Sequence, residues 1–437
     1  MVNHRLVLFV AAFLLATSDT LSRHSTDDDL ITSLPGYGVP KETQYAGYIP
    51  VNKTASLFYW FVGAQESNDT TPLVVWINGG PGASSLTGCL AENGPFTLQP
   101  NLTLVDNPFS WNRHAHMLYI DQPVGTGFSF VGSDDEYATT EDEVAVGFYS
   151  GLQGFYAKHP EYRNATLFLT GESYAGKYLP AIAEYIVEQN SQSSEPVPLE
   201  AVAIGNGLVN PPDQFSSMAL HAYNLGLIDE AQLSQATAAF IDCVSLANQG
   251  QWVQAYNVCN GMSDTIFKWA GDLFLYDIRQ HGNPFAELTS VMRKYLNQTD
   301  VKEALHVGDH VWTSGDGGNP VADHLMNEFM QPLLYKVPPL LQHVRILFYS
   351  GQFDGSCCNP AGSRTMLRTM PWPFQDEFNN APRTIWSVDG LTAGYAKSAA
   401  NLTEVLILDS GHLVPCNQPA VAYEMLTRFI AGAGWGA

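Results

Sequence analysis

The stretch LFLTGESYAGKYLPAIAEYIV, residues 167–187, contains a short apolar run, a tight turn and an amphipathic segment. Leu167–Leu169 is continuously apolar, which is typical of a strand buried on both faces. From Tyr178 to Val187 the apolar residues recur in pairs every four positions, which predicts one face of a helix. The stretch therefore predicts a strand, a sharp turn at Ser173 and a helix.

Five other apolar runs resemble Leu167–Leu169 and also end in turns rich in Gly, Asp or Asn. Their continuous rather than alternating apolar character favours a sheet that helices cover on both faces. Helical patterns lie between several of these runs, so the sequence predicts an α/β fold with a mostly parallel central sheet flanked by helices. The five runs are Leu73–Ile77, Met117–Ile120, Val202–Ile204, Arg345–Tyr349 and Val405–Leu408.

Residues 208–339 lack this pattern of recurring short apolar runs. They contain helical stretches rich in Ala, Gln and Leu, which include Asp229–Ala247 and Thr299–Val307. We interpret the region as a largely helical cap inserted between two parts of one α/β core, residues 21–207 and 340–437. A separate domain is the alternative, but the last two strands lie beyond the insertion, so the core has to close around it.

The composition limits the function classes. A length of 437 residues allows two or three domains, or one large domain that carries an insertion. The chain has 20 Lys and Arg against 43 Asp and Glu, which gives a formal net charge of −23. Such a chain repels phosphate backbones and anionic lipid, so the composition argues against nucleic-acid binding.

The N-terminus, residues 1–20, has the three parts of a secretory signal peptide. His4 and Arg5 precede the apolar run Leu6–Ala16, and small and polar residues follow it. The run is shorter than the roughly 20 residues that cross a bilayer. We therefore expect a cleaved signal rather than an uncleaved anchor, and no membrane span in the mature chain. The predicted location is the secretory pathway, with a lysosome or vacuole and the cell exterior as open destinations.

Two kinds of covalent modification fit an oxidising secretory route. Six cysteines favour disulfides over a zinc site, and we pair Cys243 with Cys259 first because they are close in sequence. Adjacent Cys357 and Cys358 are not expected to bond each other, because a vicinal bridge strains the backbone. Six N-x-Ser/Thr motifs predict glycans on surface loops. They lie at Asn52, Asn68, Asn101, Asn164, Asn297 and Asn401.

Ser173 has the sequence context of a nucleophile. It lies between Gly171 and Gly176 in a turn that follows a strand and opens a helix, as a nucleophile elbow requires. Ala175 replaces the usual second glycine of that motif. A serine hydroxyl also needs a base that removes its proton and a carboxylate that fixes the tautomer of that base.

Asp354 and His412 have the positions expected of these two partners. Each lies just beyond one of the last two predicted strands, and the chain order is Ser, Asp, His. A random chain rarely supplies both residue types at two separate strand ends. We therefore predict a catalytic triad of Ser173, Asp354 and His412.

The Gly-rich turn after Leu73–Ile77 is a candidate oxyanion hole. Such a site needs two N–H donors about 3 Å from the developing charge. The Tyr174 amide at the elbow is one candidate donor, and the Gly80 amide is the other. A phosphate-binding loop is the alternative, but no Lys-Ser/Thr pair follows these glycines.

Four blocks of the chain resemble the serine carboxypeptidases, which are acid-active secretory peptidases of the α/β-hydrolase fold. The resemblance extends from about Tyr37 to the C-terminus, and no single motif carries it. Weaker similarity includes Asn112 and residues 119–129, 276–279 and 388–395. The four blocks are Trp76–Gly82 with Ser84–Leu86, Gly171–Gly176, the Asp354 loop and Gly411–Pro415.

The resemblance implies release of the C-terminal residue from peptides or proteins at acidic pH, through an acyl-enzyme intermediate and without a cofactor or metal ion. The family's triad maps onto the three residues named above. Its site for the substrate carboxylate maps onto Asn78, the Gly79 amide, Glu92 and Glu172. A carboxylate is repelled by two ionised glutamates, so the pair has to hold a proton when substrate is bound, and acid should favour binding. Two solvated turn carboxylates are the alternative for this pair.

The chain departs from the family at Ala83, where family members commonly have a bridged cysteine. That disulfide is therefore not expected, and Cys89 or Cys416 is a candidate for a different one. Cys357 matches a position that often holds a free thiol near the substrate pocket. If it is free here, mercurials should inhibit the enzyme.

Other function classes remain open. The same fold hosts acyltransferases and esterases that use one triad on other acyl groups. An esterase, however, has no substrate carboxylate for Asn78 and the two glutamates to hold. A non-catalytic secreted binding protein is the third hypothesis, and the complete triad with both oxyanion donors argues against it. A homodimer is also left open.

Overall fold

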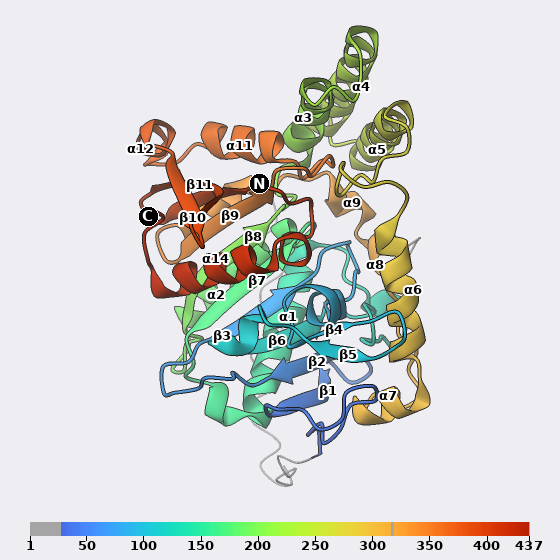
Figure 1. The fold of residues 1–437 in the computed structure, drawn as a ribbon, viewed down its shortest axis with the longest axis vertical. Helices are drawn as coiled ribbons and strands as arrows, with labels where there is room; N and C mark the ends of the chain where they lie inside the picture. The colour runs from blue at the N-terminus through green and yellow to red at the C-terminus, as the bar shows by residue number, and fades with distance from the viewer. Residues whose placement is uncertain (1–27, 316–318, 437) are drawn as a thin grey trace, which may run out of the picture.

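The computed structural model describes residues 28–315 and 319–436. The predicted signal peptide, residues 1–20, lies outside the described residues. The strands are β1 (Gln44–Pro50), β2 (Ser56–Val62), β3 (Leu73–Ile77), β4 (Phe96–Leu98), β5 (Leu104–Asp106), β6 (His116–Asp121), β7 (Leu167–Glu172), β8 (Leu199–Gly205), β9 (Arg345–Gly351), β10 (Thr384–Val388), β11 (Leu391–Ala399) and β12 (Leu402–Ile407). Ten of them form one sheet in the order β1-β2-β6-β3-β7-β8-β9-β12-β11-β10, and β4 pairs with β5 (Figure 1).

The centre of the large sheet is parallel. β6, β3, β7, β8, β9 and β12 pair in parallel in that order. β1 and β2 extend one end of the sheet with antiparallel strands, and β11 and β10 extend the other. All six predicted strands lie in the parallel part, so the predicted mostly parallel α/β fold is confirmed. The four antiparallel strands at the ends were not predicted.

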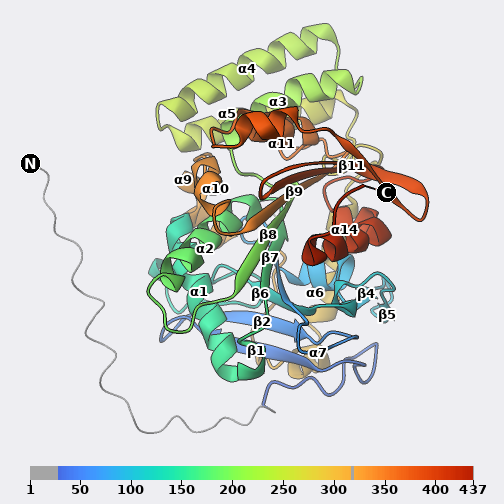
Figure 2. The same cartoon turned by 90° about the vertical axis from the view of Figure 1, so that its left-hand side faces the viewer.

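Helices cover both faces of this sheet (Figure 2). On one face, α1 (Glu141–Lys158) and α2 (Ala175–Asn190) share a buried apolar cluster with Leu73 of β3. On the other face, α14 (Pro419–Ala431) shares a second cluster with the next residue, Val74. Successive strand residues thus enter opposite cores, which explains why the strands are continuously apolar. The shorter helices of the core are α11 (Pro360–Thr369), α12 (Gln375–Asn380) and α13 (Val414–Asn417), and single helical turns cover Gly88–Glu92, Trp111–Arg113, Asp134–Glu136 and Pro160–Tyr162.

The chain between β8 and β9 is mainly helical. Its helices are α3 (Pro211–Asn224), α4 (Glu230–Asn248), α5 (Trp252–Trp269), α6 (Pro284–Leu296), α7 (Thr299–Ala304), α8 (Pro320–His324), α9 (Met326–Phe329) and α10 (Val337–Leu340), with a helical turn at Leu334–Lys336. α3, α4 and α5 form one end of the molecule (Figures 1 and 2) around an apolar cluster of their own. The predicted helix Asp229–Ala247 is α4, and the Asp229 side chain caps it by accepting from the Gln232 N–H at 2.9 Å. The predicted helix Thr299–Val307 is the shorter α7.

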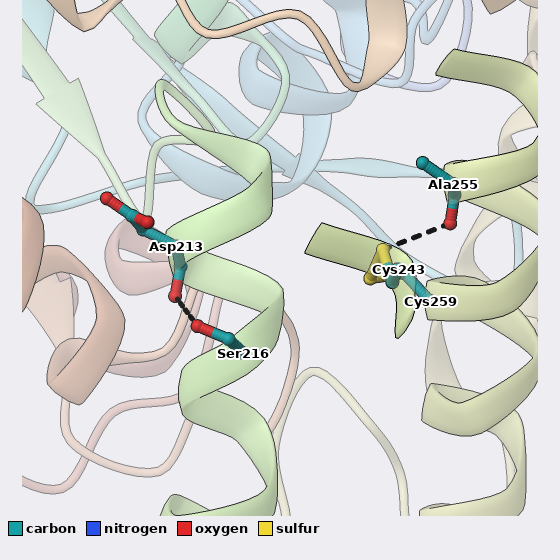
Figure 3. The surroundings of a disulfide bond; sticks show 5 residues. All are labelled: Asp213, Ser216, Cys243, Ala255 and Cys259. Carbon is teal, nitrogen blue, oxygen red and sulfur yellow. Dashed lines mark hydrogen bonds between the residues drawn. A yellow bond between two sulfur atoms is a disulfide. The ribbon is translucent and has the colours of Figure 1, made fainter. Parts of the chain in front are cut away.

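A disulfide between Cys243 and Cys259 joins α4 to α5 (Figure 3). Both cysteines are fully buried in the cluster of α3–α5, and Cys243 Sγ lies 3.1 Å from the Ala255 carbonyl oxygen. This is the pair that the sequence favoured. With a sequence separation of 16 between the bonded cysteines, closing the loop stabilises the folded state by about 3 kcal/mol in the chain-entropy model.

The other four cysteines are free thiols. The Sγ atoms of Cys357 and Cys358 lie 4.0 Å apart, so the adjacent pair is not bonded, as expected. The alternative disulfide from Cys89 or Cys416 is wrong. Cys89 is fully buried among the apolar side chains of one sheet face, and neither thiol is bonded to another cysteine.

Candidate active site

Ser173 occupies the turn between β7 and α2. Its φ of +62° lies in the left-handed region, which is unfavourable for a residue with a Cβ and is typical of a nucleophile elbow. The Ser173 N–H donates to the Gly205 carbonyl at 3.0 Å, and the Leu208 N–H donates to the Ser173 carbonyl at 2.9 Å. A Cβ on Gly176 would lie 2.7 Å from the Leu208 nitrogen. A glycine at 176 is therefore needed for the elbow to pack against the end of β8.

One cavity of about 270 Å³ contains both Ser173 and His412 in its lining. Its polar side comes from the core and includes Asn78, Gly79, Gly80 and Glu172. Its apolar side comes from the chain between β8 and β9 and includes Tyr256, Tyr276, Phe285, Met326 and Phe329. The predicted cap segment therefore supplies one wall of the cavity, and the two sequence-predicted residues meet in it.

The buried carboxylate of Asp354 holds the imidazole of His412. His412 Nδ1 lies 2.7 Å from Asp354 Oδ2. The Asn206 side-chain amide also donates to Oδ2 at 2.7 Å, and the Ser356 N–H donates to Oδ1 at 2.8 Å. Burial raises the pKa of Asp354, but the charge and hydrogen bond of His412 outweigh burial and lower the pKa below its usual value. The carboxylate therefore stays ionised and accepts the Nδ1–H of His412, which leaves Nε2 as the proton acceptor.

The second hydrogen bond of the predicted triad, between the Ser173 hydroxyl and His412, is not formed. No hydrogen bond joins these two side chains in the described part of the chain, although both line the same cavity. In enzymes without substrate, catalytic hydrogen bonds are often long and tighten when substrate binds. The described residues therefore bring Ser173, Asp354 and His412 together, with the Asp354–His412 hydrogen bond formed and the contact from Ser173 open.

A segment of the insertion lies across both loops that carry Asp354 and His412. The His412 N–H donates to the Tyr276 carbonyl at 2.6 Å, and the Gly355 N–H donates to the Leu275 carbonyl at 3.0 Å. The ring of Tyr276 also lies 4.5 Å from the His412 ring, measured between centroids. The insertion thus contacts the loops that carry Asp354 and His412, and it also lines the cavity.

The Gly-rich turn after β3 packs directly against the elbow. A Cβ on Gly79 would overlap the Tyr174 nitrogen, so the two backbones are in contact. The Gly80 and Tyr174 N–H groups, the predicted oxyanion donors, have no hydrogen-bond acceptor within residues 28–315 and 319–436. Two unused donors beside the serine are what a developing oxyanion requires.

Asn78 lines the polar end of the cavity beside Glu172 and also contacts Glu92, which is not part of the cavity lining. The Asn78 side-chain amide donates to Glu92 Oε1 at 3.2 Å and to Glu172 Oε1 at 3.0 Å. The Trp76 indole N–H and the Gly88 N–H donate to Asn78 Oδ1, at 2.8 and 3.0 Å, and so fix the orientation of the amide. The sequence resemblance identified Asn78 and both glutamates, but not the two donors that orient Asn78.

Burial strongly affects the two glutamates. Only 4% of Glu92 and 3% of Glu172 is exposed, and one oxygen of each, Oε2, has no hydrogen-bond partner among the described residues. Burial raises the pKa of Glu92 to about 7. Burial and the charge of Glu92 raise the pKa of Glu172 well above its usual value. The pair therefore retains a proton in acid, and the alternative of two solvated turn carboxylates is wrong.

Comparison with known proteins identifies the family. A family model described as serine carboxypeptidase matches residues 35–432. The chain belongs to the serine carboxypeptidase family. It is 36% identical over 393 residues to serine carboxypeptidase S10 family member 1 of Dictyostelium discoideum, which covers 89% of this chain and 94% of the relative. It is 36% identical over 394 residues to the vitellogenic carboxypeptidase of Aedes aegypti, which covers 88% and 83%.

A solved structure agrees with this assignment. A prohormone-processing carboxypeptidase from Saccharomyces cerevisiae superposes with a TM-score of 0.84 at 26% identity, covering 93% of this chain and 96% of that one. The chain is therefore a serine-type carboxypeptidase of the α/β-hydrolase fold, a hydrolase that acts on peptides. Within the described residues of this carboxypeptidase, no three side chains of the His, Cys, Asp and Glu types are grouped so that they could hold a metal ion.

A buried polar cluster beneath the elbow of the carboxypeptidase was not predicted. The hydroxyl of Tyr174 donates to Glu141 Oε1 at 2.7 Å. Lys177, which is fully buried, donates its ammonium protons to the main-chain carbonyls of Glu328 and Gln331, the second at 3.0 Å. The cluster ties α2 to the segment that follows α8, and so fixes the elbow relative to one wall of the cavity. The sequence signal was a lysine inside an otherwise apolar helix face.

Proposed function

We propose that the enzyme releases the C-terminal residue of peptides, with Ser173 as nucleophile, His412 as general base and Asp354 as the carboxylate that orients the base. The observation that carries this proposal is the hydrogen bond between Asp354 and His412 at 2.7 Å beside a cavity that also contains the strained elbow serine. Asn78 and Glu172 line the polar end of the same cavity, and the Asn78 side chain links Glu172 to the buried Glu92. A nucleophile and a carboxylate receptor in one cavity suit cleavage at a free C-terminus.

The chemical steps follow from these positions. His412 Nε2 takes the Ser173 hydroxyl proton as Oγ attacks the scissile carbonyl carbon, and the amides of Gly80 and Tyr174 stabilise the oxyanion. His412 then gives that proton to the leaving amine, so a free amino acid departs and an acyl-enzyme remains. A water molecule attacks the ester with His412 again as base, which regenerates the serine and releases the shortened peptide. Asp354 keeps its charge throughout and stabilises the imidazolium.

The carboxylate receptor explains why acid favours binding. The terminal carboxylate of the peptide accepts from the Gly79 amide, from the carboxyl proton of Glu172 and from the Asn78 side-chain amide, which gives up one of its two bonds to the glutamates. Since burial raises the pKa of Glu92 to about 7, Glu92 loses its proton as the pH rises through this value, whereas Glu172, whose pKa is raised well above its usual value, keeps its proton. A receptor without the proton on Glu92 repels the substrate carboxylate. Binding of peptides is therefore expected to be strong in acid and to weaken as the pH rises through about 7.

Replacing Glu172 with alanine tests this receptor, because glutamine would keep an N–H donor in place of the carboxyl proton. A hydrogen bond to a charged group contributes about 1.5–3 kcal/mol, so we expect Glu172→Ala to raise the KM of a blocked dipeptide about tenfold or more at acidic pH. The KM of the corresponding C-terminal amide should change little, because the amide brings no charge to the site. The measurement compares kcat and KM for both substrates from about pH 4 to about pH 8.

A matched control for this variant is Glu195→Ala, a change at an exposed loop glutamate. It should leave both substrates unaffected. Equal effects of Glu172→Ala on the peptide and on its amide would remove the carboxylate-receptor proposal. A wild-type preference for the amide or for an ester donor would favour the esterase or acyltransferase alternative.

The insertion, residues 208–339, acts in this proposal as a cap over the cavity. Its residues Tyr256, Met326 and Phe329 line the apolar wall that receives the substrate side chains. Cys357 is a partly buried free thiol of the core that packs against the cluster of α3–α5. A mercurial on this thiol would crowd the boundary between core and cap.

We further propose that the chain enters the secretory pathway. The signal-like N-terminus, the disulfide in the cap and the exposed acceptor asparagines support this location. Among the helices that the structure describes, none combines the length and the apolar character needed to cross a membrane. The substrate is a peptide or protein C-terminus, and a homodimer remains a proposal.

Glycosylation provides a test of this route, and Asn297 is expected to differ from the other acceptors. Its Nδ2 donates to the Arg293 and Trp312 carbonyls at 3.0 and 3.2 Å, so a glycan would displace one of these bonds. We expect peptide mapping after enzymatic deglycosylation to find Asn297 unmodified and glycans at the exposed acceptors. Full occupancy at Asn297 would contradict this expectation. The exposed acceptors are Asn52, Asn68, Asn101, Asn164 and Asn401.

A further inference from the structure

A second concave site lies at the end of the sheet opposite β1. There α11 and α12 pack against the outer strands near β11 (Figure 1). Between them is a pocket of about 210 Å³ that shares no lining residue with the active-site cavity. Its floor is formed by alternate residues of β11 and β12, with Lys397 directly opposite Glu404 in the strand register.

This pocket is basic in an otherwise acidic protein. Arg364, Arg368, Arg383 and Lys397 line it, and Glu404 is the one acidic residue in its lining. The pocket thus has four positive charges against one negative charge, whereas the whole chain has a formal net charge of −23. Chance placement of 20 basic residues over the surface of this chain would rarely bring four into one small pocket.

Placing these basic side chains together costs free energy, because their like charges repel. Arg364 and Arg368 are four residues apart on α11 and so lie on the same helix face, where like charges destabilise a helix by a few tenths of a kcal/mol. Arg364 Nε lies 3.6 Å from Glu404 Oε1, which offsets one charge. The guanidinium groups of Arg368 and Arg383 have no hydrogen-bond or ion-pair partner within the described residues. Two cations with unused donors therefore face a concave space.

Aromatic side chains and main-chain contacts hold part of the pocket in place. The Arg383 guanidinium carbon lies 3.9 Å from the centroid of the Tyr395 ring, which is a close cation–π contact. Lys397 Nζ donates to the Asn379 carbonyl at 2.8 Å and lies 5.1 Å from the centroid of the Phe378 ring. Such contacts reduce the entropy that these side chains would lose on binding a ligand.

We propose that this pocket binds a tetrahedral oxyanion, either a free phosphate or sulfate or the same group as a monoester. Guanidinium groups present planar pairs of N–H donors that match phosphate and sulfate oxygens. Three guanidiniums and one ammonium offer more donors than one carboxylate can accept, whereas a tetrahedral anion has three or four acceptor oxygens. The part-exposed ring of Tyr395 beside the cations provides a surface for the organic part of a monoester. The site is independent of the proposed peptidase mechanism.

Calorimetry with defined anions tests the proposal. Phosphate, sulfate, phenyl phosphate and phenyl sulfate are titrated into the full-length enzyme at constant ionic strength in chloride. We expect a Kd of about 1 mM or tighter for at least one of the four. Phosphate or sulfate binding without binding of the phenyl esters would assign a free-anion site, whereas equal or tighter binding of a phenyl ester would assign a monoester site.

A double variant tests whether the binding heat measured by calorimetry comes from anion binding in this pocket. Arg368→Gln with Arg383→Gln should weaken binding at least tenfold while kcat and KM for a blocked dipeptide stay at wild-type values, which shows that the variant is folded. The matched control is Arg113→Gln, which removes another arginine stacked on a tyrosine, Tyr423, with neither residue in the lining of this pocket. No binding of any of the four anions, or equal binding by the wild type and the double variant, would overturn the proposal.

Discussion

The Ser173→Ala enzyme is expected to lose activity on blocked dipeptides by a factor of about 10⁴ to 10⁶ in kcat. Ser173 Oγ forms the ester bond of the acyl-enzyme, and the hydroxyl of the neighbouring Tyr174 donates to Glu141 Oε1 instead. Residual hydrolysis would come from the oxyanion donors and the carboxylate receptor, which still hold the substrate. KM should therefore change little. The measurement is kcat and KM for one blocked dipeptide at acidic pH.

Ser194→Ala is the matched control for this variant, because Ser194 is exposed in a loop beyond α2. It should keep wild-type kinetics. The strain at Ser173, whose φ is +62°, is not relieved by alanine, so both variants should melt close to the wild-type temperature. An alanine enzyme that retains a tenth of wild-type kcat while folded would rule out Ser173 as the nucleophile.

Asp354→Asn is expected to lower kcat by about 10⁴-fold with a small effect on KM. Both oxygens of Asp354 accept hydrogen bonds, Oδ1 from the Ser356 N–H and Oδ2 from Asn206 and His412. An asparagine has only one oxygen, so its NH₂ group must face one of these donors. If it faces His412, the imidazole takes the wrong tautomer and Nε2 carries a proton that blocks the base. We expect the same loss of kcat throughout the acidic pH range, because the substitution acts on the catalytic step and not on substrate binding.

The control for Asp354→Asn is Asp376→Asn at an exposed position of α12, which should be neutral. A thermal melt separates loss of the base from loss of the fold, since removal of a buried charge next to His412 also affects stability. A folded Asp354→Asn enzyme with kcat within tenfold of wild type would contradict the role of Asp354. A large increase in KM alone would place Asp354 in binding instead.

The parallel centre of the sheet could be predicted because its strands are buried on both faces. Leu73–Ile77 and Arg345–Tyr349 are apolar without alternation, which is the pattern that covered strands require. The outer strands carry a weaker signal. β10 and β11 mix exposed and buried residues, so they do not stand out as apolar runs. β1 likewise mixes buried and part-exposed residues, whereas its hairpin partner β2 is fully buried and was missed although it has the apolar pattern of a covered strand.

The residues of the site also differ in how far they could be predicted from the sequence, because some follow from local motifs and others from contacts between distant segments. Ser173, Asp354 and His412 follow from strand ends and from chain order, which are local features. Asn206 and Tyr276 do not, because their roles depend on contacts between segments far apart in sequence. Asn206 follows β8 and reaches Asp354 after β9, over a separation of 148 residues. Lys177 was visible only as a lysine in an apolar pattern, and its partners lie about 150 residues away.

The most direct test of the central claim is covalent labelling of the wild-type enzyme with a fluorophosphonate at acidic pH. The reagent phosphonylates an activated serine, with fluoride as leaving group and the serine proton taken by the base. The mechanism predicts one added label per chain, located by peptide mapping on Ser173, with activity lost in proportion to labelling. Labelling should vanish in Ser173→Ala and fall sharply in Asp354→Asn. A label on another serine with parallel loss of activity, or full activity in an enzyme labelled at Ser173, would contradict it.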